Sequence, residues 1–112
     1  MKLIIGSDQN GYEMKEAIKE HLDELEVGYD DIGCESSTDP ILYPEIAHKL
    51  AVQVSEGKYE RGILICGTGL GMAMTANKVP GVFAATCHDI HSAERARKSN
   101  NAQIIIFGAQ VI

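Results

Sequence analysis

The chain has 112 residues, of which 45% are apolar and only 5% aromatic, so residues 1–112 are expected to form a single small domain with an aliphatic core. Its formal net charge is −6 and it has no run of basic residues, which argues against a nucleic-acid surface. The three cysteines have no paired spacing and the N-terminal apolar run is too short for a signal peptide or membrane span, so we expect a cytoplasmic protein without a disulfide framework.

Short runs of β-branched residues alternate with helical patterns along the chain. In chain order, the sequence predicts a strand at 3–5, a helix at 12–25, a strand at 29–33, a helix from Pro44 to Gly57, a strand at 62–66 and a helix ending near Asn77. It then predicts a strand within 79–86 after a turn at Pro80-Gly81, a helix at 89–99 and a strand at 103–107. The apolar face predicted for the first helix consists of Met14, Ile18, Leu22 and Leu25. Strands separated by helices are typical of a parallel sheet that is covered on both faces. We therefore predict an α/β fold, a three-layer α/β/α Rossmann-like domain with a five-stranded parallel sheet.

Polar segments follow two of the predicted strands, at the sheet edge where ligands of open parallel sheets bind. Residues 6–11 follow the first strand, and residues 66–71 follow the third. A third polar segment, residues 99–102, precedes the fifth strand and is therefore expected at the opposite edge. A neighbouring subunit could supply that segment to the site.

Residues 67–71 (Gly-Thr-Gly-Leu-Gly) have glycine at every second position, between a predicted strand and a predicted helix. Such a turn can curl until successive backbone N–H groups converge on one point, which is a binding site for a phosphate or a developing oxyanion. The other interpretation is a tight turn without a ligand, although one or two glycines would suffice for that. Met72 stands where a dinucleotide-binding fingerprint requires glycine, and no P-loop lysine follows.

Cys66 directly precedes this glycine-rich turn. Backbone N–H groups and a helix N-terminus stabilise a thiolate, so Cys66 is a candidate base or nucleophile. The alternative interpretation is a buried core cysteine at the end of a strand. Elsewhere, the group Cys87, His88 and His91 matches no standard set of metal ligands, so no metal site is predicted there.

Several motifs follow one another along the chain: residues 6–13 (Gly-Ser-Asp-Gln-Asn-Gly-Tyr-Glu), Tyr43-Pro44, residues 61–69 (Arg-Gly-Ile-Leu-Ile-Cys-Gly-Thr-Gly), residues 76–81 (Ala-Asn-Lys-Val-Pro-Gly) and Asn100-Asn101-Ala102. Together they resemble the type B ribose-5-phosphate isomerases and the galactose-6-phosphate isomerases, and the resemblance covers essentially the whole chain. Those proteins continue into a C-terminal helix that docks on a partner subunit. We expect this sequence to lack that helix.

The resemblance implies proton transfer between C1 and C2 of an open-chain sugar phosphate, without a metal or cofactor. Cys66 matches the family's base, and Thr68 matches a residue that assists ring opening. The positions that match substrate-binding residues are Asp8, Gln9, Tyr43, Gly67, Gly69, Gly71 and Asn100. Asp8 would hold sugar hydroxyls, while the glycine-rich turn and Asn100 would stabilise the oxyanion. A homodimer or dimer of dimers with shared active sites is also implied, with no nucleic-acid or membrane partner.

Three positions depart from the family pattern. Ribose isomerases usually have histidine at the position of Gln9, the ring-opening histidine at Ser99 and a phosphate-binding arginine at Gln110. A tetrulose phosphate cannot cyclise, so its isomerisation needs no ring-opening group. Residues 88–95 and 99–105 are indeed similar to the tetrulose-4-phosphate isomerase branch of the family, although that similarity does not account for Gln110.

Two functional hypotheses therefore remain open. The first is an aldose–ketose isomerase that acts on the ribose 5-phosphate/ribulose 5-phosphate pair or on a tetrulose 4-phosphate. The second is a non-catalytic or heteromeric partner subunit, since the galactose-6-phosphate isomerases use dissimilar chains. A nucleotide-binding module on the same fold is disfavoured by Met72.

Overall fold

The computed structural model describes residues 2–112 and contains five strands, four α-helices and one short 3₁₀ turn. In chain order, the elements are β1 (Leu3–Ser7), η1 (Gln9–Gly11), α1 (Tyr12–Glu24), β2 (Tyr29–Asp31), α2 (Tyr43–Ser55), β3 (Arg61–Cys66), α3 (Leu70–Ala76), β4 (Ala84–Thr86), α4 (Ile90–Lys98) and β5 (Ile104–Gly108). Within residues 2–112, no helix has both the length and the apolar character needed to cross a bilayer.

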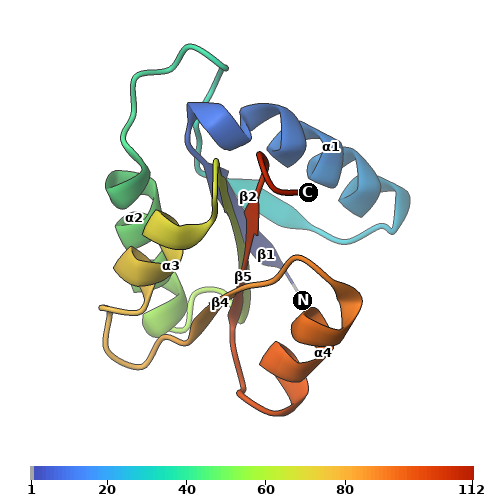
Figure 1. Ribbon diagram of the computed structural model, residues 1–112, viewed down its shortest axis with the longest axis vertical. Helices are drawn as coiled ribbons and strands as arrows, with labels where there is room; N and C mark the ends of the chain where they lie inside the picture. Colours follow the sequence, from blue (N-terminus) through green and yellow to red (C-terminus); the bar gives the residue numbers. More distant parts are fainter. Residues whose placement is uncertain (1) are drawn as a thin grey trace.

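All strand pairs of the sheet are parallel, in the order β2-β1-β3-β5-β4. Helices α2 and α3 cover one face of the sheet, and α1 and α4 cover the other (Figure 1). These observations confirm the predicted three-layer Rossmann-like arrangement. Because the chain runs outward from β1 to β2 and then returns past β1 to β3, the topological switch point lies between β1 and β3. Ligands of such sheets bind at the carboxyl ends of the strands beside that point.

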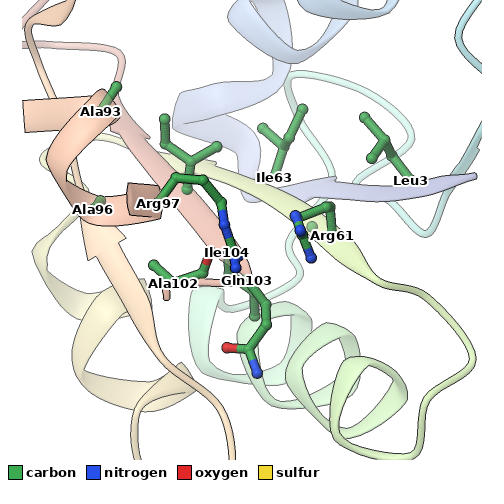
Figure 2. Close-up of a pocket in the computed structure, with 11 residues that line it drawn as sticks. Leu3, Arg61, Ile63, Ala93, Ala96, Arg97, Ala102, Gln103 and Ile104 are labelled. Atoms are coloured by element: carbon green, nitrogen blue, oxygen red, sulfur yellow. Dashed lines mark hydrogen bonds between the residues drawn. The ribbon is translucent and has the colours of Figure 1, made fainter. Parts of the chain in front are cut away.

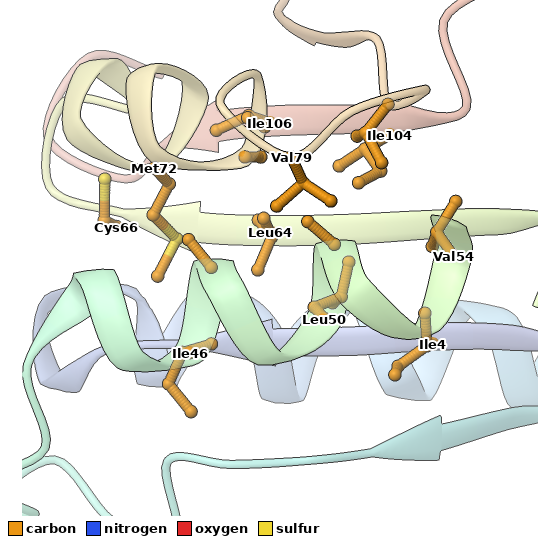
Figure 3. Close-up of a cluster of buried hydrophobic side chains, with 14 residues drawn as sticks. Ile4, Ile46, Leu50, Val54, Leu64, Cys66, Met72, Val79, Ile104 and Ile106 are labelled. Carbon is orange, nitrogen blue, oxygen red and sulfur yellow. The ribbon is translucent and has the colours of Figure 1, made fainter. Parts of the chain in front are cut away.

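The main core lies between the sheet and helices α2 and α3. Ile46, Leu50 and Val54, spaced four residues apart, place one face of α2 against β1 and β3 (Figure 3). Gly62 of β3 lets this helix approach closely, since a Cβ at that position would lie 2.8 Å from Cδ2 of Leu50. Cys66 stands at the end of the same cluster, where the core meets the carboxyl edge of the sheet.

Helix α1 packs differently from its predicted apolar face. Leu22 is buried, but Leu25 is 58% exposed because the helix ends at Glu24 and the chain turns away there. Lys15 is instead only 1% exposed, and its Nζ donates hydrogen bonds to both carboxylate oxygens of Asp31, each at 2.9 Å. Burial alone would raise the pKa of Asp31, but the hydrogen bonds from Lys15 and Lys19 outweigh it and hold that pKa below its ordinary value.

The fourth strand is much shorter than predicted. Of the predicted span 79–86, only Ala84–Thr86 forms β4. Pro80 has no N–H to donate to a ladder, and Gly81 has a positive φ of 84°. A turn results instead, in which Val82 N donates to Val79 O at 3.2 Å. The predicted Pro80-Gly81 turn is confirmed, but the strand was predicted too long, because the β-branched residues at 79 and 82 fill the core from this turn rather than from a strand.

Candidate functional site

A cavity of about 280 Å³ opens where the carboxyl ends of β1 and β3 meet, at the switch point of the sheet. Its lining consists of Asp8, Asn10, Tyr43, Cys66, Gly67, Thr68, Gly71 and Gln110. The cavity therefore brings together six of the nine residues predicted to form the site. Within residues 2–112, no cationic side chain is part of this lining.

The glycine-rich turn adopts the curled backbone that its sequence predicts. Gly69 has a φ of 81°, a conformation that favours glycine, and a Cβ there would lie 2.8 Å from Cγ2 of Thr86. Within residues 2–112, the N–H groups of Gly67, Thr68 and Gly71 have no hydrogen-bond acceptor. The turn, residues 67–71, is called the nest below, because it offers unpaired N–H donors to an anion.

The carbonyl groups of the nest are held by neighbouring backbone. Ala109 N donates to the carbonyl of Cys66 at 2.8 Å, and Gln110 N donates to the carbonyl of Gly67 at 2.9 Å. Gly108 permits this close packing, since a Cβ there would lie 2.5 Å from the carbonyl oxygen of Thr68. The loop after β5 thus fixes which way the first peptides of the nest face.

Cys66 belongs both to the core and to the cavity. It is 5% exposed, packs with the core cluster on one side and lines the cavity on the other. Its Sγ accepts a hydrogen bond from Gly69 N at 3.1 Å. This contact places the sulfur against the backbone N–H groups of the nest.

Asp8 approaches the same cavity from the end of β1. It is 7% exposed, and its Oδ1 accepts a hydrogen bond from Gly11 N at 3.1 Å. Burial raises the pKa of this carboxyl group above its ordinary value. Gly11 keeps the loop pressed on β3, since a Cβ there would lie 2.5 Å from the carbonyl oxygen of Ile65. Asp8 is therefore held in place at the wall of the cavity that Cys66 also lines.

Two larger side chains form the walls of the cavity. The ring of Tyr43, the first residue of α2, packs directly on Gly71, where a Cβ would lie 2.4 Å from Cε1 of the ring. The amide group of Gln110 covers Gly67, where a Cβ would lie 3.0 Å from Cδ of Gln110. Both glycines thus leave room for close side-chain contacts at the cavity wall.

The remaining predicted residues lie outside the cavity lining. Gln9 is exposed in η1, and Gly69 lies behind the cavity, where its N–H contacts the thiol. Asn100 is exposed between α4 and β5, at the opposite edge of the sheet from Cys66, as its place before β5 predicts. The cavity also includes Asn10 and Gln110, which were not predicted to bind substrate.

A second hollow, of about 270 Å³, lies under α4 on the other face of the sheet (Figure 2). Ala93 and Ala96 of α4 face Ile63 of β3 and Leu3 of β1 across it. Its walls are mostly apolar, and it holds none of the residues that the sequence predicts for catalysis or substrate binding.

Comparison with known proteins matches the chain as a whole to one enzyme family. The profile of the family described as Ribose/Galactose Isomerase matches residues 3–112. The ribose-5-P isomerase B of Listeria innocua serovar 6a is 52% identical over 112 residues, which cover 100% of this chain and 75% of the relative. The D-erythrulose-4-phosphate isomerase of Pectobacterium atrosepticum is 45% identical over 112 residues, which cover 100% of this chain and 74% of the relative. The structure of the Clostridium thermocellum ribose-5-phosphate isomerase B superposes with a TM-score of 0.96 at 40% identity, covering 100% of this chain and 75% of that one.

Proposed function

The chain belongs to the ribose/galactose isomerase family, as an aldose–ketose isomerase of phosphorylated sugars, and we propose that Cys66 is its proton-transferring base. The observation that carries this proposal is the position of the thiol, which accepts the Gly69 N–H at 3.1 Å and adjoins the unpaired N–H groups of the nest. A base and an oxyanion site are the two elements that enolisation requires.

In the proposed reaction, the Cys66 thiolate removes the proton from the carbon next to the carbonyl of the open-chain aldose. The electron pair of that C–H bond forms the enediolate double bond, and the negative charge moves to the carbonyl oxygen, where the nest N–H groups stabilise it. The thiol then returns the proton to the former carbonyl carbon, and the hydroxyl proton passes between the two oxygens. Asp8 accepts hydrogen bonds from sugar hydroxyls, and Thr68 assists ring opening where the substrate is cyclic.

Two lengths of substrate compete within this function. Relatives at 52% and 45% identity are named for a five-carbon and a four-carbon sugar phosphate, respectively. Within residues 2–112, the cavity lining includes no histidine that could serve ring opening, which favours an aldose phosphate that remains open. The test is the ratio of kcat/KM for erythrulose 4-phosphate to that for ribose 5-phosphate. Turnover of neither compound, nor of other sugar phosphates, by the purified protein would refute the proposed function.

The proposal includes a homodimer, or a dimer of dimers, in which each site receives Asn100 from the partner. Asn100 lies at the opposite edge of its own sheet, so it can assist only the Cys66 of another copy. The exposed apolar side chain of Ile90 and the hollow under α4 in Figure 2 support a protein interface on this face.

Mixing two inactive variants tests the shared site. Cys66→Ser and Asn100→Ala homodimers should each be inactive, whereas the mixed dimer regains one intact site, so about a quarter of all sites recover after subunit exchange. No recovery of activity between variants that exchange subunits would refute the shared site.

The comparisons lend no support to the alternative of a non-catalytic partner subunit. The three free thiols support a reducing, cytoplasmic location.

A further inference from the structure

The end of β4 contacts the nest through side chains that the mechanism above does not use. The Oγ1 of Thr86 donates a hydrogen bond to the carbonyl oxygen of Gly69 at 2.9 Å. The methyl group of Thr86 also packs against Gly69, because its Cγ2 lies 2.8 Å from the position that a Cβ on this glycine would occupy. This single side chain therefore fixes the peptide that links Gly69 to the first residue of α3.

His88, two residues further on, holds the neighbouring strand end. Thr86 pairs with Ile106, so β4 would reach Gly108 of β5 two residues later if the ladder continued. The chain leaves the sheet at that point, and Gly108 N donates to Nε2 of His88 at 3.0 Å instead. The imidazole thus replaces a strand carbonyl that β4 no longer supplies.

Gly108 transmits this contact to the nest. Gly108 packs tightly on the peptide of Thr68, since a Cβ on this glycine would lie 2.5 Å from the carbonyl oxygen of Thr68. No methyl group fits between the two residues. The next residue, Ala109, then binds the carbonyl of Cys66 at 2.8 Å. A shift of Gly108 would therefore move both the nest and the strand end that carries the thiol.

We propose that Thr86 and His88 are positioning residues, which hold the nest in the curvature that stabilises the enediolate oxyanion. Neither side chain lines the cavity, so neither touches the substrate. The inference rests on the proposed isomerase function and extends it to the ends of β4 and β5. Because the nest acts on charge that develops in the transition state, losing its curvature lowers kcat more than it raises KM.

Paired variants separate the hydrogen bonds from the shape of the side chains. Thr86→Val removes the donor and keeps the volume, whereas Thr86→Ser keeps the donor. His88→Leu removes the acceptor, whereas His88→Gln restores one. Thr38→Val is a matched control, since Thr38 is an exposed loop residue whose side chain forms a hydrogen bond with Ser36, its only side-chain partner within residues 2–112. Each variant is measured as the full chain with the better of the two sugar phosphates.

Thr86→Val and His88→Leu are each expected to lower kcat about ten-fold or more, while KM changes by less than about three-fold. A rate loss of this size is typical when the groups around the reacting atoms are slightly displaced. Inhibition by a phosphorylated hydroxamate that mimics the enediolate should weaken by the same factor as kcat/KM. Thr86→Ser and His88→Gln should recover most of the rate, and Thr38→Val should match the unaltered chain.

In folded protein, an unchanged kcat for Thr86→Val and His88→Leu would overturn the inference. So would a loss that Thr86→Ser and His88→Gln fail to rescue. Backbone ¹⁵N relaxation of residues 67–71 gives a readout that does not depend on turnover. Thr86→Val should introduce microsecond–millisecond exchange there, and Thr86→Ser should not. If the unaltered chain turns over no sugar phosphate, the proposed function fails, while the relaxation comparison still decides whether Thr86 holds the nest.

Discussion

Replacement of Cys66 by serine tests the proposed base with little change in shape. A serine hydroxyl can still accept the Gly69 N–H that Sγ accepts at 3.1 Å, so the nest keeps its contact. A hydroxyl is a far weaker acid than a thiol, so it supplies almost no anionic base near neutral pH. We expect kcat to fall by about 10²-fold or more, the contribution of a positioned base, which corresponds to about 2.7 kcal/mol of transition-state stabilisation.

The loss of stability should be much smaller than the loss of rate. The Gly69 hydrogen bond is retained, so the free energy of unfolding should change by only about 1 kcal/mol. Cys87→Ser is the matched control, because Cys87 is also a buried thiol but lies outside the cavity. The assay combines sugar-phosphate turnover with NMR detection of solvent deuterium entering C1 of the ketose that is formed from the aldose. Deuterium entry at an unchanged rate in Cys66→Ser would show that another group moves the proton.

Three further predictions concern the walls of the cavity and the face of α1. Gly71→Ala should raise KM about ten-fold, because a Cβ would lie 2.4 Å from the ring of Tyr43 and push the ring into the cavity. An unchanged KM would mean that the Tyr43 ring moves aside without narrowing the cavity. Gln110→Arg should lower KM for sugar phosphates about ten-fold, by adding a bidentate cation beside Gly67, and a higher KM would contradict a phosphate at this end. Lys15→Met should cost about 1–3 kcal/mol, as measured by urea unfolding, because it removes the buried partner of an ion pair whose carboxylate, Asp31, is partly exposed and keeps its contact with Lys19. The hydrogen bonds from Lys15 and Lys19 hold the pKa of Asp31 below its ordinary 3.8 in the folded protein. The stability that ionised Asp31 contributes is therefore complete above pH 3.8 and is lost as the pH falls through the lowered pKa. An acid-unfolding curve of Lys15→Met identical to that of the unaltered chain would refute the ion pair between Lys15 and Asp31.

The fold and much of the site follow from local patterns in the sequence. The alternation of strand and helix patterns predicts the parallel sheet, and the alternating glycines predict the nest. These predictions succeed because periodicity and backbone freedom are properties of short segments.

The features that escaped prediction depend on contacts between distant segments. A lysine in a helical pattern indicates a solvated face, yet Lys15 is buried because Asp31, sixteen residues later, meets it. The amide of Gln110 enters the cavity only because the loop after β5 folds back over Gly67. No spacing within either segment specifies such a meeting, since both depend on how β1, β3 and β5 are ordered in the sheet.

The electrostatic character of the cavity connects catalysis with assembly. An acidic chain of net charge −6 must bind a phosphorylated substrate, yet the cavity lining in residues 2–112 offers N–H dipoles and amides but no cation. The last turn of α4, by contrast, carries Arg95, Arg97 and Lys98, directly before the turn that holds Asn100. A partner subunit that delivers Asn100 to the site would bring this basic turn with it. Sharing the site would thereby supply the positive charge that the cavity of one chain lacks, so substrate affinity and dimer formation would depend on the same segment.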